Sequence, residues 1–443
     1  MKKILLFGAG KSATVLIDYL LFTAAEENWF VRVADADLKL AQSKVGDSSF
    51  AKAISFDIND ENERAIAIQG ADIVISLLPP TLHFLVAEDC VRYSKNLLTA
   101  SYVDDKTEEL KDDIERKGLL FLCEMGLDPG IDHMSAMRVV DNIRSNGGSV
   151  VSFKSHCGGL VAPESDDNPW HYKISWNPRN VVLAGKAGAV FKDHGKKITV
   201  AYDKIFEHCP DIHVNDLPVL ASYPNRDSLS YSSLYGLEET STFIRTTLRY
   251  DSFCRGWDVL VHLGLTDTED DIVKYQTVSE WFHDKIKGIE LRKMEWLEYL
   301  QLYVDEKHHA EITEQMDYLG LFEIVPVPFH AKCSADILQS LLEAKLVLKP
   351  DDKDMIVMLH EIEFETADGQ KKKIESSLVV KGEDSLRTAM AKTVGLPLGI
   401  AAKLILEDKI HLTGVHMPIH KEIYEPVLKE LENCGIVFKE IEK

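Results

Sequence analysis

The residues at the start of the chain have the types and spacing that bind a phosphate-containing ligand. Gly8, Gly10 and Ala13 form a Gly-x-Gly-x-x-Ala pattern between an apolar run at 3–7 and a helical pattern at 14–21. In such a turn the first glycine permits a tight bend, the second lets the backbone approach a pyrophosphate, and the alanine allows close helix packing. Free N–H groups at the helix N-terminus favour the negative charge of the phosphates. The pattern predicts a dinucleotide site; its structural alternative is a tight strand–helix connection without a ligand.

An acidic residue, Asp35, ends the second apolar run at 29–35. In a dinucleotide-binding fold the acid at this position binds the ribose hydroxyls of NAD, whereas NADP sites usually offer arginine. Asp37 follows, and no Arg or Lys appears before Lys39, so a ribose phosphate would meet negative charge here. We therefore expect NAD as the preferred cofactor, with NADP as the alternative. A strand-end Asp in solvent is the explanation left open.

Polar groups also follow two later strands. Ser101 and Tyr102 come after the run at 96–100, where their hydroxyls would face a ligand, although an ordinary polar strand end has the same composition. Residues 124–133 hold two glycines and a proline and would form a constrained loop that presents Asp128. This loop can be a turn with a helix N-cap at Asp132. The functional hypothesis places Asp128 beside the nicotinamide of the cofactor.

Two arginines are the best candidates for holding an acidic substrate. Arg226 lies in a predicted turn and Arg249 ends an apolar strand. Arginine grips carboxylates with two parallel hydrogen bonds. Each one alone is more often a surface ion pair, but together in an acidic chain they indicate a carboxylate-rich substrate. His156 and Cys157 resemble a nucleophile pair, but adjacent strand residues point to opposite faces, so we do not expect a hydrolase.

The elements that must position these residues alternate along the first part of the chain. After 3–7 and 29–35, further strands are expected at 53–57, 71–78, 96–100 and 119–122, with amphipathic helices between them. This alternation is typical of an α/β fold with a parallel, doubly wound sheet. In that fold ligands bind at the carboxyl ends of the strands, where the polar residues above are found.

The pattern changes after about residue 133, which predicts further domains. Longer strands at 150–153, 197–202 and 242–250 indicate an α+β domain, and 269–322 reads as helical, for example at 290–297. A hairpin is expected at 355–364 and 371–379 around 367–369, and a helix pair at 385–405 broken by Gly395-Leu396-Pro397. The predicted division is a dinucleotide-binding domain at 1–132 plus about 386–443, a substrate domain at about 133–268 plus 336–385, and a helical subdomain at about 269–335.

Composition limits the possible partners. The 443-residue chain has a net charge of −22, which argues against nucleic acid or an anionic membrane as partner. The seven cysteines are scattered and form no CxxC pair, so neither a disulfide framework nor a metal site is expected. We expect no apolar run long enough to span a membrane, and Met1-Lys2-Lys3 leads into a strand, so we expect a cytoplasmic protein.

Several of these motifs, in the same order over nearly the whole chain, resemble the saccharopine dehydrogenase family, specifically its glutamate-forming branch. The most specific motif is Leu-Asp-Pro-Gly-Ile-Asp-His at 127–133. The others are Gly8-x-Gly10, residues 72–77, 157–160 with 162–164, 224–228, 247–250 and 393–395. The resemblance implies a variant Rossmann domain, an α/β substrate and dimerisation domain, a small helical domain and a homodimer. It also implies oxidation of the secondary amine of saccharopine to an imine by NAD(P), with hydrolysis to glutamate and 2-aminoadipate 6-semialdehyde.

The resemblance also assigns residues. It implies these cofactor contacts: Ala9, Gly10, Lys11, Ser12, Asp35, Asp57, Ile58, Leu78 and Ala100. We also expect cofactor contacts at Gly8, Ser101, Leu127, Asp128 and Pro129. The resemblance implies these substrate contacts: Ser101, Tyr102, Asp128, Arg226, Thr247 and Arg249. The reaction needs a general base tuned toward neutral pH, and the candidates, in order, are Asp128, Tyr102 and Cys157.

Two departures from the fungal members bear on the cofactor and the substrate. Those proteins use NADP and have Cys-Arg-Thr where this chain has Asp35-Ala36-Asp37, so the loss of arginine supports NAD. Their Pro-Tyr-Thr becomes Pro79-Pro80-Thr81, which removes an aromatic residue near the nicotinamide. Two rival functions are an imine reductase of the carboxynorspermidine dehydrogenase type and a non-catalytic NAD-binding protein. A polyamine-like substrate would need fewer arginines, which favours saccharopine.

Overall fold

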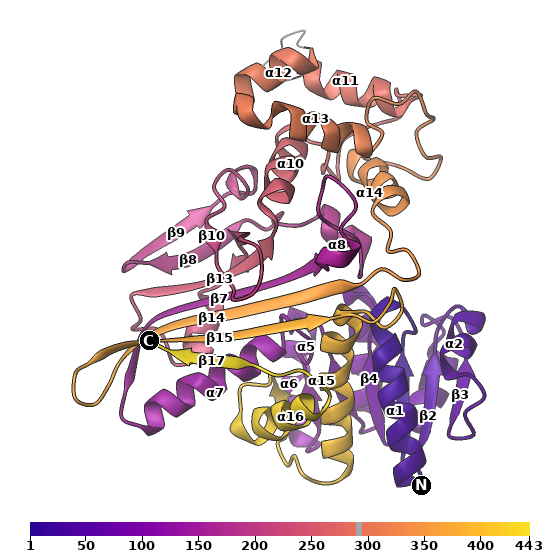
Figure 1. Cartoon of the computed structure of the whole chain (residues 1–443). Coiled ribbons are helices and arrows are strands. Elements are labelled where there is room, and N and C mark those ends of the chain that lie inside the picture. The colour runs from indigo at the N-terminus through magenta and orange to yellow at the C-terminus, as the bar shows by residue number, and fades with distance from the viewer. Residues whose placement is uncertain (289–294) are drawn as a thin grey trace. The chain divides into compact units, whose positions relative to one another are not determined.

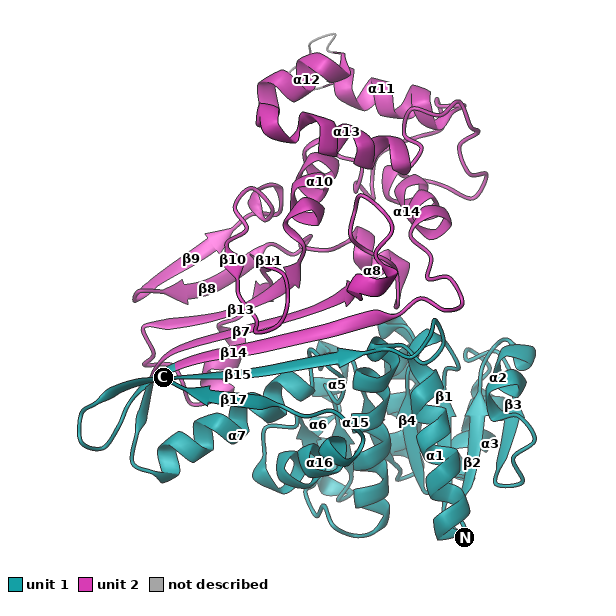
Figure 2. Ribbon diagram, viewed as in Figure 1, with its two compact units in different colours: residues 1–150, 363–443 teal, residues 151–362 magenta. Residues whose placement is uncertain are grey.

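The chain forms two compact units, which are described one at a time. The computed structural model describes residues 1–288 and 295–443. Unit 1 comprises residues 1–150 and 363–443, and unit 2 comprises residues 151–362 (Figure 2). The sequence-based division into three domains stays a prediction.

Unit 1 is built on a parallel sheet of seven strands in the order β16-β6-β5-β4-β1-β2-β3 (Figure 1). Reading β3-β2-β1-β4-β5-β6 across the sheet gives the strand order of a Rossmann fold. The strands are β1 (Lys3–Phe7), β2 (Phe30–Ala34), β3 (Ala51–Ile54), β4 (Ile73–Ser76), β5 (Asn96–Thr99), β6 (Leu120–Leu122) and β16 (Gly414–His416). The α/β fold class is therefore confirmed. Two details differ: β3 lies two to three residues earlier than expected, and β16 was not predicted, because a three-residue edge strand carries little apolar pattern.

Helices cover both faces of this sheet, as expected for strands that are buried on both sides. They are α1 (Thr14–Glu27), α2 (Leu38–Val45), α3 (Glu61–Gln69), α4 (His83–Arg92), α5 (Asp105–Glu109), α6 (Lys111–Arg116), α7 (Ile131–Ser145), α15 (Ala389–Leu406) and α16 (Lys421–Asn433). On one face Leu5, Val74 and Phe121 pack with side chains of α3, α4 and α6. An antiparallel pair, β15 (Lys371–Lys381) with β17 (Lys439–Glu442), completes the unit.

The expected return of the C-terminal part to the cofactor unit is seen in α15, which packs on α1. A Cβ on Gly395 would lie 2.9 Å from the backbone nitrogen of Leu16, so only glycine allows this approach. The predicted helix pair, broken at Gly395-Leu396-Pro397, is wrong: α15 is one helix with Pro397 inside it. Pro397 costs one helical hydrogen bond, and burial of nearly the whole helix compensates for that loss.

The same helix corrects the prediction that no run approaches a membrane span. By length and composition α15 could cross a membrane, with a mean hydropathy of 1.5 over 18 residues. In the structure 78% of this window is buried inside the protein, as in the core helix of a folded unit. The apolar composition of α15 therefore has an explanation in packing.

In unit 2 the strands follow the order β10-β11-β13-β7-β14. Their bounds are β7 (Ser149–Val161), β10 (Asp211–Ile212), β11 (Leu220–Pro224), β13 (Thr242–Arg249) and β14 (Asp354–Glu365). A side ribbon is formed by β8 (Ala189–Asp193), β9 (Lys196–Val200) and β12 (Arg226–Asp227). The strand β13 lies in the middle of this order, where it runs parallel to β7 and antiparallel to β11.

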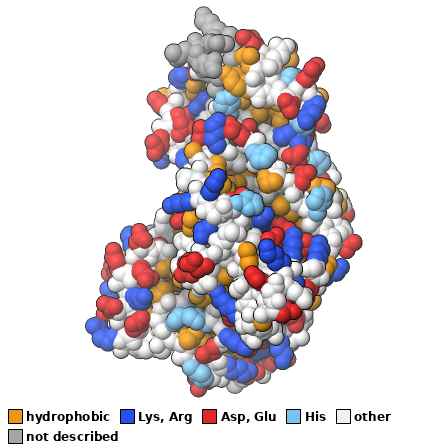
Figure 3. All heavy atoms as spheres, turned by 90° about the vertical axis from the view of Figure 1, so that its left-hand side faces the viewer, with side chains coloured by type: hydrophobic (Ala, Val, Ile, Leu, Met, Phe, Trp, Pro, Cys, Tyr) orange, Lys and Arg blue, Asp and Glu red, His pale blue; other side chains and the backbone are white. Residues whose placement is uncertain are grey.

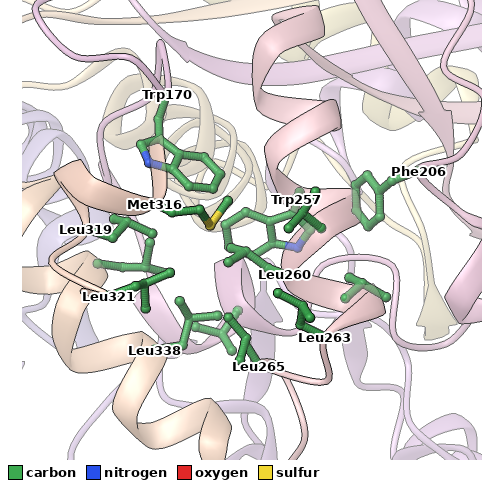
Figure 4. Packing of buried hydrophobic residues seen from close by; sticks show 14 of the residues in the cluster. Trp170, Phe206, Trp257, Leu260, Leu263, Leu265, Met316, Leu319, Leu321 and Leu338 are labelled. Atoms are coloured by element: carbon green, nitrogen blue, oxygen red, sulfur yellow. The ribbon is translucent and has the colours of Figure 1, made fainter. Parts of the chain in front are cut away.

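The helices of unit 2 enclose a second core. They are α8 (Pro178–Val182), α9 (Ser230–Leu234), α10 (Asp251–His262), α11 (Val278–Gly288), α12 (Trp296–Tyr303), α13 (His309–Tyr318) and α14 (Ser334–Lys345). Trp257 of α10 lies among Trp170, Met316 and Leu260 in this core (Figure 4). The helical character predicted for 269–322 is confirmed in the described part, whereas residues 290–294 of the predicted stretch 290–297 lie outside the described residues.

Candidate functional site

The glycine turn of unit 1 has the geometry that its sequence predicts. Gly8 has a φ of +99°, and a Cβ there would lie 2.9 Å from the carbonyl oxygen of Leu77. Gly10 is exposed, and a Cβ added to it would meet no atom within 4 Å. The turn therefore needs glycine at position 8 for its shape, while the open space beside Gly10 leaves room for a phosphate. Lys11 and Ser12 follow in the first helical turn, Lys11–Ala13.

Asp35 is joined directly to this turn. Its Oδ2 accepts a hydrogen bond from the backbone N–H of Ala9 at 2.7 Å, and its Oδ1 accepts one from the N–H of Asp37 at 2.9 Å. Each carboxylate oxygen retains a second lone pair that a ribose hydroxyl could use. The structure therefore brings Gly8, Ala9, Gly10 and Asp35 together, and these residues fit a dinucleotide.

A cation that the sequence analysis missed lies against the same turn. The Nζ of Lys44 donates to the carbonyl oxygen of Gly10 at 2.8 Å and to Oγ1 of Thr14 at 2.6 Å. Burial lowers the pKa of Lys44, and the carboxylates of Asp18 and Asp35 oppose that effect. Lys44 is ten residues beyond the end of β2, so only tertiary packing could reveal it.

The other predicted cofactor contacts in unit 1 follow the carboxyl ends of the strands. Leu78 is half-buried after β4, two residues beyond Ser76. Asp57 is exposed after β3, where hydrogen bonds from the backbone and side chain of Asn59 lower the pKa of Asp57. The carbonyl of Ile58 accepts from Nη1 of Arg64 at 2.6 Å.

The loops after β5 and β6 are bonded to each other at the same edge. The backbone N–H of Glu124 donates to the carbonyl of Ser101, and that of Met125 donates to Thr99, both at 3.0 Å. A Cβ on Gly126 would lie 3.1 Å from the Cβ of Ala100. The structure therefore places Ala100 and Ser101 beside the loop that holds Leu127, Asp128 and Pro129.

The Asp128 loop is constrained by its glycines, as its sequence predicts. Gly130 has a φ of +146°, and a Cβ there would lie 2.1 Å from the carbonyl oxygen of Gly126. The N–H of Gly130 donates to Oδ1 of Asp132 at 2.6 Å, just before α7 begins. Asp128 itself is half-buried in this loop.

A buried pair that the sequence analysis did not single out ties these loops to α7. The Nε2 of His133 lies 2.9 Å from Oε2 of Glu124, and both side chains are buried. The other oxygen of Glu124 accepts from the N–H of Val103 at 3.3 Å. Glu124 has a φ of +57°, an unusual conformation for a residue other than glycine. The pair therefore fixes the segment that contains Tyr102.

In unit 2 the guanidinium of Arg249 is buried among aromatic rings. Its side chain is 5% exposed and lies over the rings of Tyr172 and Phe253, 5.1 and 5.5 Å from their centroids. Nη1 donates to the carbonyls of Leu248 and Gly159 at 2.7 and 3.3 Å, while Nε is buried without a hydrogen-bond partner. Within the described residues no carboxylate pairs with it. A buried charge without a counter-ion is costly, which indicates a site for an anionic ligand.

Two of the other predicted residues lie next to Arg249 in the sheet. Thr247, two residues before Arg249 on β13, is paired with Cys157 of β7 and with Tyr223 of β11. Burial raises the pKa of Tyr223 to about 12, although the charge of Arg249 opposes this shift. Arg226, by contrast, is exposed on β12 with a φ of +50°.

His156 and Cys157 do not form a nucleophile–base pair. The ring of His156 lies 2.7 Å from Oγ1 of Thr246 and 3.2 Å from Oε2 of Glu361. Cys157 is the next residue of the same strand and is opposite Thr247 in the register. This arrangement agrees with the expectation that the two side chains serve different faces.

The strand order of unit 1, its glycine turn and the acid at the end of β2 define a dinucleotide-binding protein of the Rossmann class. Family models give the particular family: residues 4–122 match the saccharopine dehydrogenase NADP binding domain and residues 126–436 match the saccharopine dehydrogenase C-terminal domain. The chain belongs to the saccharopine dehydrogenase family.

Individual relatives agree with this assignment. The chain is 34% identical to saccharopine dehydrogenase [NADP(+), L-glutamate-forming] of Saccharomyces cerevisiae, over 99% of both chains. It is also 34% identical to alpha-aminoadipic semialdehyde synthase of Arabidopsis thaliana over 99% of its own length, but it spans only 44% of that longer protein. The solved apo structure of saccharopine dehydrogenase (L-Glu forming) from S. cerevisiae superposes with a TM-score of 0.89 at 33% identity, covering 100% of both chains.

Proposed function

We propose that the protein interconverts saccharopine with L-glutamate and 2-aminoadipate 6-semialdehyde. In the oxidative direction the secondary amine loses a hydride and a proton to become an imine, and water then cleaves the C=N bond into an amine and an aldehyde. The observation that carries the proposal in this chain is the buried Arg249, which lacks a carboxylate partner among the described residues. A substrate with several carboxylates provides that partner, and the family relationship identifies the substrate class.

Hydride transfer, substrate binding and proton removal are assigned to different groups. A bound nicotinamide dinucleotide accepts or donates the hydride. The guanidinium of Arg249 binds a substrate carboxylate. Further proposed substrate contacts are Arg226, Thr247, Ser101 and Tyr102, and Ser101 is also proposed as a cofactor contact. The general base that removes the amine proton is drawn from Asp128, Tyr102 and Cys157, in that order. The glycines on either side of Asp128 hold its loop in one shape.

The protein uses NAD(P), and the preference between the two forms is a separate proposal. The carboxylate of Asp35 lies at the glycine turn, where a 2′-phosphate would be repelled, and this supports NAD. The matching family model is described as NADP binding and the yeast relative is named for NADP(+). Asp35 is therefore proposed to shift this chain toward NAD within a family that includes NADP users.

The remaining sequence-based expectations are a homodimer in the cytoplasm and no nucleic-acid or membrane partner. Acidic and basic side chains are interspersed on the face drawn in Figure 3, so the basic residues there are not gathered into one field. Sedimentation equilibrium at several concentrations tests the dimer directly.

The reaction is tested by absorbance at the band of the reduced cofactor, with saccharopine and either NAD⁺ or NADP⁺. Formation of reduced cofactor and equimolar glutamate supports the function, and a higher kcat/KM with NAD⁺ supports the role of Asp35. A preference for NADP⁺ would keep the reaction and reject the cofactor proposal. Cofactor binding without turnover of saccharopine would reject the reaction.

A further inference from the structure

The imidazole of His83 joins the carboxyl ends of two neighbouring strands in unit 1. His83 is the first residue of α4, and its ring is almost completely buried, with 6% of the residue exposed. Its Nδ1 lies 2.8 Å from Oγ of Ser76, the last residue of β4. Its Nε2 lies 2.8 Å from Oγ of Ser101, two residues beyond the end of β5. One ring therefore bridges β4 and β5 at the edge where dinucleotides bind.

The protonation state of the ring determines what its two nitrogens can do. Burial lowers the pKa of His83 to about 4, although the carboxylate of Asp104 opposes the shift. The imidazole is thus neutral at physiological pH, so one ring nitrogen donates a hydrogen bond and the other accepts one. In either tautomer both serine hydroxyls have a partner on the ring, and this partner holds the Ser101 oxygen in place.

The main chain of Ser101 is held by other groups, so its hydroxyl remains available to His83. The backbone N–H of Ser101 donates to Oγ1 of Thr99 at 3.2 Å, and its carbonyl accepts from the N–H of Glu124 at 3.0 Å. The main chain is therefore held by the strand and by the Asp128 loop. The side chain is held by His83 at 2.8 Å, while Thr99 is farther from the ring, at 3.5 Å.

We propose that His83 is a positioning residue, which presents the Ser101 hydroxyl to the cofactor through Nε2 while Nδ1 is anchored on Ser76. The role of Ser101 as a cofactor contact rests on the proposed function. A purely structural histidine would fill the space and satisfy the two serines without affecting binding through Ser101. The two roles are separable because each ring nitrogen has a different partner.

Two polar substitutions separate the ring nitrogens. The amide of His83→Gln extends to about the position of Nε2 and keeps the contact with Ser101, whereas His83→Asn reaches only the position of Nδ1 and keeps Ser76. The readouts are the dissociation constant of NADH and NADPH, from protein fluorescence, and kcat/KM for saccharopine. We expect about 10-fold weaker cofactor binding for His83→Asn and for Ser101→Ala, and less than 3-fold for His83→Gln.

A double-mutant comparison tests whether the effect passes through Ser101. In the Ser101→Ala background His83→Asn should weaken binding by less than 2-fold. Equal losses for the Asn and Gln variants, or an unchanged cofactor affinity in Ser101→Ala, would each overturn the proposal. A further 10-fold loss on adding His83→Asn to Ser101→Ala would overturn it as well. Because the dissociation constant needs no saccharopine, failure of this proposal is distinguishable from failure of the proposed reaction.

Ser76→Ala tests the same proposal while His83 itself is unchanged. Releasing Nδ1 should weaken cofactor binding about 3-fold in the native background and have no effect in Ser101→Ala. If His83→Asn does not fold, this pair decides the question alone: equal losses in both backgrounds would show that the network is only structural.

Discussion

The carboxylate of Asp35 accepts a hydrogen bond from the backbone N–H of Ala9, 2.7 Å away, and so links the end of β2 to the glycine turn after β1. The same carboxylate has two tasks, because it stabilises the glycine turn and sets the charge that the adenosine ribose would meet. Substitutions can separate these tasks, since an amide keeps an acceptor oxygen but loses the charge.

We predict that Asp35→Asn changes cofactor preference without unfolding unit 1. Removal of the negative charge should tighten NADP⁺ binding relative to NAD⁺ by about 10-fold, equivalent to roughly 1.4 kcal/mol. Titration calorimetry with both cofactors measures the ratio. Asp47→Asn, which removes an exposed charge from the same unit, is the matched control and should leave the ratio unchanged. An unaltered ratio in Asp35→Asn would show that this carboxylate does not face the ribose.

Alanine substitutions of Gly8 and Gly10 should affect different properties of the protein. Gly8→Ala forces a side chain into a φ of +99° and against the carbonyl of Leu77, so the free energy of unfolding should fall by about 3 kcal/mol. Gly10→Ala places its methyl in open space, and unfolding should change by less than about 0.5 kcal/mol. Cofactor affinity should nevertheless fall at least about 10-fold, because the methyl occupies the space for the phosphate. Denaturant unfolding and cofactor titration of the two variants provide the comparison.

Arg249 should determine substrate affinity more than folding. Arg249→Lys keeps the charge but loses the planar, two-pronged donor, and we expect KM for saccharopine to rise about 10- to 100-fold with a smaller change in kcat. Saccharopine should also raise the unfolding temperature of the native protein and not that of the variant. Lys186→Arg, at an exposed position of the same unit, is the control. A normal KM in Arg249→Lys would remove this guanidinium from the substrate site.

Asp258, on α10, predicts a pH dependence of stability. Burial and the nearby Glu207 raise the pKa of Asp258 to about 6, while Lys204 acts in the opposite direction. Because the folded state holds this proton more tightly than the unfolded chain, the stabilising effect is complete below about pH 4 and is lost as pH rises through about 6.

The variant Asp258→Asn should therefore have no advantage at pH 4 and be more stable than the native protein by about 2 kcal/mol at pH 8. Urea unfolding at the two pH values is the measurement. The same gain at both values would mean that ionisation of Asp258 is not its cause.

Part of the fold could be predicted from local patterns, because buried parallel strands appear as short apolar runs. The runs that became β1, β2, β4, β5 and β6 were found in this way, and the Gly8 turn was found because its glycines follow a strand directly. The break assigned to Pro397 failed, since local propensity favours a break where burial of α15 favours a continuous helix.

The site shows the same division between local and tertiary information. Arg249 could be proposed because it ends an apolar strand, but its missing counter-ion is known only from the packing of Tyr172 and Phe253 around it. His83 and Glu124 lie at a helix start and after a strand, and each has an ordinary local sequence. The partner of His83 is Ser101, 18 residues later, and the partner of Glu124 is His133, 9 residues later. These pairings could be identified only from the folded structure.

The discontinuity of unit 1 has a consequence for biosynthesis. Its sheet begins with β1 near residue 3 and is completed by β16 near residue 415, and α15 packs on α1 through Gly395. A ribosome must therefore translate all of residues 151–362 before the cofactor unit can close. Until then the apolar side of α1 that α15 covers is exposed in the nascent chain, where a chaperone that recognises apolar helices would have its best opportunity to bind.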